Sequence, residues 1–227
     1  MDRIIRGIAM EGKVRAFAVE TTSVVEHLRQ RHDTWPTATA ALGRAVSAGA
    51  LLAATLKDDD KLTIQIKGNG PLGQIVVDAR ASGEVRGYVD QPHVDLPLNA
   101  EGKLDVAGAV GREGYIYVIK DLGLKEPYRG SVPIVSGELA EDFTYYLATS
   151  EQTPSAVALG VLIDTDRSVK ASGGFMIQLM PGLSDEEISQ IENQLAQLEG
   201  ISRLLETGLP LADILRQVLP SVNILQE

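Results

Sequence analysis

The chain has 227 residues, of which 44% are hydrophobic and 4% aromatic, so its core consists mainly of aliphatic side chains and alanine. It contains no cysteine, which excludes disulfides and thiolate metal sites within this sequence. The formal net charge is -10, and residues 136–227 carry all of it with 14 acidic and 4 basic residues, whereas residues 1–135 hold 17 of each sign. Because an acidic chain repels phosphate backbones, we expect no nucleic-acid partner.

No segment has the pattern of a membrane span or a signal peptide. The longest apolar run, Ala45 to Leu56, is too short to cross a bilayer. The basic N-terminal residues lead into Glu11 and Lys13 instead of into an apolar stretch. We therefore expect a cytoplasmic protein without membrane contact.

Residues 1–56 predict two extended segments followed by two helices. Ser23 and Glu26 have the spacing of a capping box, which predicts a helix from about Val24. Pro36 is suited to the first turn of a second helix, which is rich in alanine and glycine. Small side chains would let this helix pack closely against a sheet or another helix.

From Lys61 onward apolar and polar residues alternate with a period of two, which is typical of half-buried strands. Turn-forming residues separate most of the segments, which favours antiparallel meanders. The predicted strands are Leu62 to Ile66, Gln74 to Asp78, Glu84 to Val89, Tyr115 to Ile119, Tyr128 to Val135, Ala156 to Ile163 and Gly174 to Met180. The expected fold class is α+β, with a twisted, largely antiparallel sheet packed with helices over residues 1–180.

A linker region of short amphipathic helices is predicted over residues 181–227, after a boundary at Pro181-Gly182. Ser184 and Glu187 form a capping box for the first of these helices. Helices this short are marginal in isolation and need a surface to lie on. Their apolar residues form the candidate functional surface: Leu183, Ile188, Ile191, Leu195, Leu198, Leu204, Leu205, Ile214, Leu215 and Val218.

Three partial motifs do not amount to a ligand site. Gly68 to Gly73 match the dinucleotide fingerprint G-x-G-x-x-G, but a predicted strand follows where the fingerprint needs a helix, so we interpret the segment as a hairpin. The three histidines lack metal-binding spacing. Asp164 and Asp166 begin like a calcium loop that lacks the required glycine and glutamate. We predict no cofactor and no metal site in this chain.

The polar stretch from Asp121 to Ser155 raises the question of an active site. Ser136, Ser150 and Ser155 could each act as a nucleophile, but none lies in a G-x-S-x-G elbow and no histidine follows His93. A serine–lysine arrangement stays open, with these candidate lysines: Lys120, Lys125 and Lys170. A small hydrolase with a site near Ser136 or Ser150 is therefore an alternative interpretation.

Three carboxylates in the same stretch invite an acid–base interpretation. Glu138, Glu141 and Asp142 crowd the first turn of a predicted helix, where the helix macrodipole favours negative charge. Capping of the helix explains them without catalysis. We predict no catalytic residue.

Five segments of distinctive sequence occur in one order along the chain. They are K-G-N-G-P-L-G (Lys67 to Gly73), V-R-G-Y (Val85 to Tyr88), Y-R-G-S-V-P-I-V-S-G (Tyr128 to Gly137), S-E-Q-T-P-S (Ser150 to Ser155) and G-G-F-M-I-Q-L-M-P (Gly173 to Pro181). With them the chain resembles the bacterial heat shock protein thirty-three family, the thirty-three-kDa chaperonins. The resemblance covers essentially the whole chain. It implies an ATP-independent, redox-regulated holdase that binds unfolding proteins through exposed apolar surface and prevents their aggregation.

The family also implies a C-terminal zinc domain with a Cys-x-Cys and a Cys-x-x-Cys pair, whose oxidation loosens the linker. This sequence stops at Glu227 without any cysteine, so no zinc ligand can be carried over. We expect a truncated form of the family that lacks the redox switch. Zinc belongs only to the full-length family protein.

The resemblance implies unfolding client proteins as partners, and a homodimer. Marginal helices on a flexible Pro-Gly hinge are prone to exchange between copies, so we expect the linker region to be able to swap. A structural protein that dimerises without acting on clients is the remaining alternative.

Overall fold

The computed structural model describes residues 2–226 and contains two five-stranded antiparallel sheets. The first sheet runs in the order β10 (Asn223–Gln226), β1 (Arg3–Ala9), β2 (Val14–Glu20), β9 (Val169–Leu179) and β8 (Ser155–Ile163). The second runs in the order β5 (Val85–Val89), β4 (Gln74–Arg80), β3 (Lys61–Gly68), β6 (Gly114–Asp121) and β7 (Tyr128–Pro133). The predicted α+β class is confirmed, and the strands divide between two sheets.

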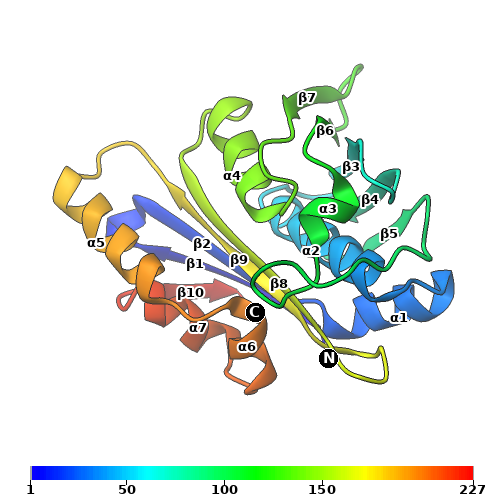
Figure 1. Ribbon diagram of the computed structural model, residues 1–227. Helices are drawn as coiled ribbons and strands as arrows, with labels where there is room; N and C mark the ends of the chain where they lie inside the picture. Colours follow the sequence, from blue (N-terminus) through cyan, green and yellow to red (C-terminus); the bar gives the residue numbers. More distant parts are fainter. Residues whose placement is uncertain (1, 227) are drawn as a thin grey trace.

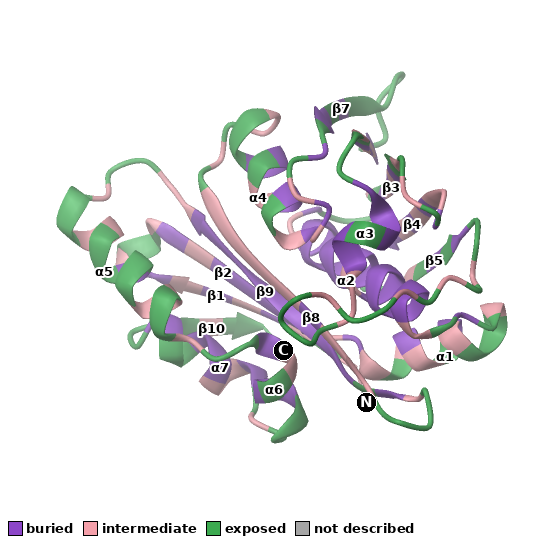
Figure 2. Cartoon of the chain, viewed as in Figure 1, coloured by how far each residue is buried: buried purple, intermediate pink, exposed green. Residues whose placement is uncertain are grey.

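Helix α2 (Pro36–Ala53) lies between the two sheets and forms the centre of the main core (Figure 1). Sixteen of its 18 residues are buried, and Figure 2 shows it as the most continuously buried helix. It contacts β8 and β9 on one side and β4 and β5 on the other. A Cβ atom added at Gly49 would come within 2.7 Å of Val77 Cγ1, so the small residues of this helix allow the close packing that we predicted.

Helix α1 (Thr22–His32) is capped by a residue distant from it in sequence. The carboxylate of Asp2 accepts hydrogen bonds from the N–H groups of Ser23 (2.8 Å) and Val24 (2.7 Å). Glu26 instead accepts two hydrogen bonds from Arg29 and one from the N–H of Val169, which join α1 to β9. The hydrogen bonds from Arg29, more than any other contact, lower the pKa of Glu26 to about 2. The predicted capping box is therefore wrong, because Glu26 finds other partners.

The hairpin interpretation of Gly68 to Gly73 is correct. The segment links β3 to β4 and lies against the C-terminal end of the short helix α3 (Val106–Val110). A Cβ atom at Gly68 would lie 2.0 Å from the carbonyl oxygen of Val110, so only glycine permits this approach. The close contact is between two backbone segments, and β4 follows where the dinucleotide fingerprint needs a helix.

The linker region forms three helices and the edge strand of the first sheet. The helices are α5 (Asp185–Gln197), α6 (Ile201–Glu206) and α7 (Leu211–Val218). The capping box at the start of α5 is confirmed, since Ser184 Oγ accepts the N–H of Glu187 and the Glu187 carboxylate accepts the N–H of Ser184. Strand β10, which we did not predict, pairs with β1. The domain boundary at Pro181-Gly182 stays a prediction.

The buried carboxylate of Asp142 holds the junction between β7 and helix α4 (Ala140–Thr149). One oxygen, Oδ1, accepts the N–H groups of Val135 (2.7 Å) and Ser136 (2.9 Å). The other, Oδ2, accepts the N–H groups of Gly137 (3.0 Å) and Leu139 (2.8 Å) and the hydroxyl of Ser136 (3.1 Å). This carboxylate is therefore a structural acceptor that caps the helix, as we predicted.

Replacing Asp142 with asparagine should lower the free energy of unfolding by about 2–4 kcal/mol, because an amide nitrogen at either oxygen position leaves buried N–H donors without an acceptor. Equilibrium unfolding in urea measures the change. Glu141→Gln lies on the exposed side of the same helix and is the matched control, with an expected change below about 0.5 kcal/mol. Similar destabilisation by both variants would contradict the role assigned to Asp142.

Candidate functional site

The helices of the linker region cover the outer face of the first sheet, which is the face that points away from α2 (Figure 1). Helix α6 packs on β8 and β9, α7 packs on β2, and α5 packs on α7. Their apolar side chains and those of the strands form a second hydrophobic cluster, separate from the core around α2. The first sheet is therefore covered on both faces.

All ten apolar residues predicted for the linker region are at least partly buried. Those that are buried are Ile191, Leu204, Leu205, Ile214, Leu215 and Val218. Those of intermediate burial are Leu183, Ile188, Leu195 and Leu198. Four buried residues of the same cluster are absent from the predicted set: Ile201, Leu211, Leu219 and Val222. The period-two spacing of Val222 and Ile224 is the signal that could have revealed β10.

The linker region packs closely against two glycines of the first sheet. A Cβ atom at Gly160 in β8 would lie 2.7 Å from Ile201 Cγ2 and 2.8 Å from the backbone nitrogen of Ser202. A Cβ atom at Gly7 in β1 would lie 2.8 Å from Val222 Cγ2. In both cases the added methyl group would clash with a residue of the linker region. The absence of a side chain at these two positions therefore lets the linker region pack directly on the strands.

Polar side-chain contacts contribute little to the attachment of the linker helices. Lys170 binds Glu206 (2.8 Å), and this hydrogen bond raises the pKa of Lys170. Lys13 lies 3.8 Å from Glu187. Ion pairs on the surface each contribute at most about 1 kcal/mol. The attachment of the helices therefore depends mainly on apolar packing, whereas β10 is held on β1 by the backbone hydrogen bonds of an antiparallel ladder.

Helix α5 is the least firmly attached of the three helices. Ile191 is its only buried residue, and most of its surface is exposed in Figure 2. It reaches the sheet through α7, while α6 and α7 contact strands directly. We expect a release of the linker region to begin at α5, because local opening starts where few apolar contacts are lost.

The candidate serines do not share a site, and the hydroxyl of Ser155 donates to the carbonyl oxygen of Thr153 (2.9 Å). The hydroxyl of Ser136 donates to Asp142 and accepts the N–H of Glu138, so it is engaged in the turn before α4. Ser150 Oγ lies 3.3 Å from the hydroxyl of Tyr128. Neither Ser136 nor Ser150 lines either of the two clefts described in the structure.

Among the described residues, none of the three candidate lysines pairs with a candidate serine. Two of them pair with carboxylates, and the third lines the smaller cleft. Lys120 is 9% exposed and donates to Glu151 Oε1, which also accepts the hydroxyl of Tyr146 (2.8 Å). Burial, with Glu151 as the second cause, raises the pKa of Tyr146. Lys125 lines the smaller cleft, and Lys170 pairs with Glu206. Within residues 2–226 no hydrogen bond joins one of these lysines to a candidate serine, although Lys120 and Ser150 both contact Tyr128, so the serine–lysine pair that the hydrolase alternative needs is not formed.

The residues present do not fit a zinc site. The sequence has no cysteine, and within residues 2–226 no group of three or more histidine, aspartate or glutamate side chains could hold a metal ion. His93 Nε2 lies 2.9 Å from Asp33 Oδ2, and its ring stands beside that of Trp35 with 5.2 Å between centroids. This histidine therefore joins the loop after α1 to the loop after β5.

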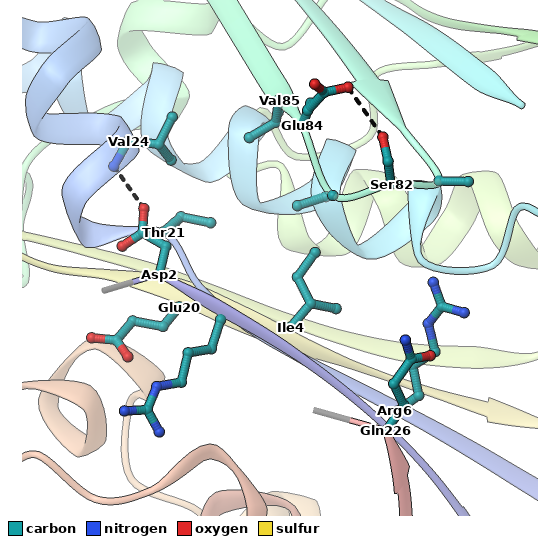
Figure 3. Close-up of a pocket in the computed structure, with 14 residues that line it drawn as sticks. Asp2, Ile4, Arg6, Glu20, Thr21, Val24, Ser82, Glu84, Val85 and Gln226 are labelled. Atoms are coloured by element: carbon teal, nitrogen blue, oxygen red, sulfur yellow. Dashed lines mark hydrogen bonds between the residues drawn. The ribbon is translucent and has the colours of Figure 1, made fainter. Parts of the chain in front are cut away.

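The larger cleft has a volume of about 590 Å³ and lies between β1, the start of α1 and the turn from β4 to β5 (Figure 3). Asp2, Glu20 and Glu84 line it, and two of these carboxylates are already engaged, since Asp2 accepts the N–H of Val24 and Glu84 accepts the hydroxyl of Ser82 (3.1 Å). Side chains of both charges line it, and they do not converge on one point. The cleft is also distinct from the surface under the linker helices.

Known proteins resemble this chain along its whole length. The family model described as Hsp33 protein matches residues 2–227. The 33 kDa chaperonin of Bacillus velezensis is 56% identical over 219 residues, which span 96% of this chain and 75% of the relative. The 33 kDa chaperonin of Enterococcus faecalis is 56% identical over 207 residues, which span 91% of this chain and 70% of the relative.

A solved structure has the same fold. The crystal structure of the 33 kDa chaperonin from Thermotoga maritima superposes with a TM-score of 0.92 at 42% identity, over 98% of this chain and 78% of that one. Among residues 2–226 no helix is both long and apolar enough to cross a bilayer. The resemblance inferred from the five sequence segments is confirmed. The chain belongs to the Hsp33 family.

Proposed function

We propose that this chain is an ATP-independent holdase chaperone that binds unfolding proteins on apolar surface uncovered when the linker region leaves the first sheet. One observation carries the proposal: an apolar sheet face is covered only by short helices that are held mainly by apolar packing. The name of the relatives, 33 kDa chaperonin, supports a chaperone function.

Release of the linker region would expose apolar groups on both partners. The sheet face contributes Ile5, Phe175 and Ile177, each at most 1% exposed while the linker is docked. The linker helices contribute the apolar residues described above. Contiguous apolar patches of more than a few hundred Å² are typical of protein interaction sites. A client segment could therefore replace the linker contacts with similar apolar contacts of its own.

The acidic character of the linker region suits this function. Asp185, Glu186 and Glu187 lie in the first turn of α5, and Glu192 lies on an exposed position further along. Like charges keep surfaces apart, so a complex with an exposed apolar client would stay soluble. We further propose that the chain acts in the cytoplasm without catalysis. None of its 227 residues is a cysteine, so no thiol of this sequence could operate a redox switch.

The chain should suppress the aggregation of a heat-denatured client without ATP, and reductant should not change this activity. Light scattering of a thermolabile client, with and without the chain, measures the effect. Unchanged aggregation would sink the holdase proposal and favour a structural dimerisation protein. An activity that depends on reductant would instead contradict the absence of a switch.

Gly160→Ala should increase holdase activity and apolar exposure, because the added methyl group would meet Ile201 and Ser202 of the linker region. Overpacking of about 1–3 kcal/mol would raise the population of the released linker by roughly 5-fold to 150-fold. Client light scattering and the fluorescence of a dye that binds apolar surface measure the two effects.

Gly200→Ala is the matched control, since a Cβ atom there would meet no other atom within 4 Å and its φ is -55°. It should behave like the parent chain.

If released linkers exchange between copies, as we propose, Gly160→Ala should also show more dimer by size-exclusion chromatography with light-scattering detection. If the two variants behaved equally in all three measurements, packing of the linker region on Gly160 would not control its release.

A further inference from the structure

The outer face of the second sheet is open. Inward side chains of its strands pack on α2, and among residues 2–226 no helix contacts the strands from the other side. Figure 1 places this sheet across α2 from the first sheet, so the open face lies far from the linker region. The chaperone function proposed above makes no use of it.

Tyrosine rings and basic side chains form adjacent rows on this face. Tyr117 stands opposite Gln65 on β3 and opposite Ser131 on β7. In the next row, Tyr115 stands opposite Lys67. The two tyrosine ring centroids are 6.1 Å apart, and Lys67 Nζ lies 5.5 Å from the centroid of Tyr117. Tyr115 is 51% exposed, so its ring is available to a ligand.

The charge of this face is opposite to that of the chain. The strands of the second sheet direct five basic and two acidic side chains outward: Lys61, Lys67, Arg80, Arg86 and Arg129, with Asp78 and Asp121. The two acidic residues are already paired, with Arg86 (2.9 Å) and Lys61 (3.3 Å). Within the described part of the chain, Lys67 and Arg129 form no ion pair.

A hollow of about 370 Å³ continues the basic face toward the loop between β6 and β7. Ile119 and Thr63 form part of its floor on the sheet, and Leu124 and Lys125 of the loop line it as well. Arg129 stands opposite Ile119 on the neighbouring strand. The hollow therefore has the apolar surface for a flat ring and cations beside it.

We propose that this face binds single-stranded nucleic acid, with Tyr115 and Tyr117 stacking on bases and Lys67 and Arg129 contacting phosphates. An open sheet with exposed aromatic rings between basic residues provides both contacts that a single strand offers. Paired bases of a duplex are stacked inside the helix and could not reach the rings. An acidic polypeptide would satisfy the cations but has no planar group that requires the tyrosines.

The proposal revises the expectation drawn from the net charge of the whole chain. All of the acidic excess lies in residues 136–227, which include the linker helices on the opposite side of the molecule. Electrostatic attraction acts over about a Debye length, roughly 10 Å in dilute salt, so the local face decides whether a phosphate binds.

Fluorescence anisotropy of labelled single-stranded RNA and DNA oligonucleotides tests the proposal on the full chain. Tyr115→Ala and Tyr117→Ala should each weaken binding by about tenfold, because each removes one stacking surface. Two phosphate contacts predict a roughly sevenfold loss of affinity when salt is raised about fourfold, and Lys67→Gln with Arg129→Gln should remove most of this dependence. Separate RNA and DNA titrations show which sugar is preferred.

Matched controls lie outside the face. Tyr145→Ala removes a ring of 38% exposure on α4, and Arg31→Gln removes an exposed charge on α1. Neither should change the affinity, and none of the variants should change client protection. No anisotropy change up to about 100 µM protein, the weak limit of non-specific binding, would overturn the proposal. Displacement by polyglutamate, with no effect of the tyrosine variants, would also overturn it and assign the face to acidic polypeptides.

Discussion

The apolar contact between the linker helices and the outer face of the first sheet determines the state of this molecule. While it persists, the apolar residues of both partners are buried and the sheet is closed on both faces. The contact is close, because Gly160 and Gly7 leave no room for a side chain beneath Ile201 and Val222. Few ion pairs reinforce it, and the polar attachment of the linker region is mainly the backbone ladder between β10 and β1. A close apolar contact between helices and sheet, with few polar side-chain contacts, is suited to a surface that must be alternately covered and uncovered.

The rest of the fold supplies a rigid partner for this movable segment. Helix α2 is buried between the sheets, Asp142 fixes the turn from β7 to α4, and Glu26 ties α1 to β9. Loss of the linker contacts would leave these interactions intact. The S-E-Q-T-P-S segment belongs to this rigid part, because Glu151 binds Lys120 and Tyr146. Polar residues that resemble an active site in the sequence therefore stabilise the scaffold.

Local signals in the sequence predicted the elements, and contacts between distant segments decided the features that were missed. The strands from Lys61 onward and the capping box of Ser184 and Glu187 depend on neighbouring residues, and the structure confirms them. The cap of α1 comes from Asp2, and β10 forms only because β1 offers an edge. The apolar stripes predicted that the linker helices need a surface. They could not show which surface, because a stripe does not identify its partner.

The central claim is that clients bind only after the linker region leaves the sheet. Cysteines introduced as Lys170→Cys and Glu206→Cys and joined by a reducible thiol crosslinker test it directly, because the two parent side chains meet at 2.8 Å between β9 and α6, both are exposed, and the chain has no other cysteine. Client aggregation is followed by light scattering with the tethered chain and again after reduction. We expect the tethered chain to give no protection and the reduced chain to protect. Equal protection by both forms would contradict the account.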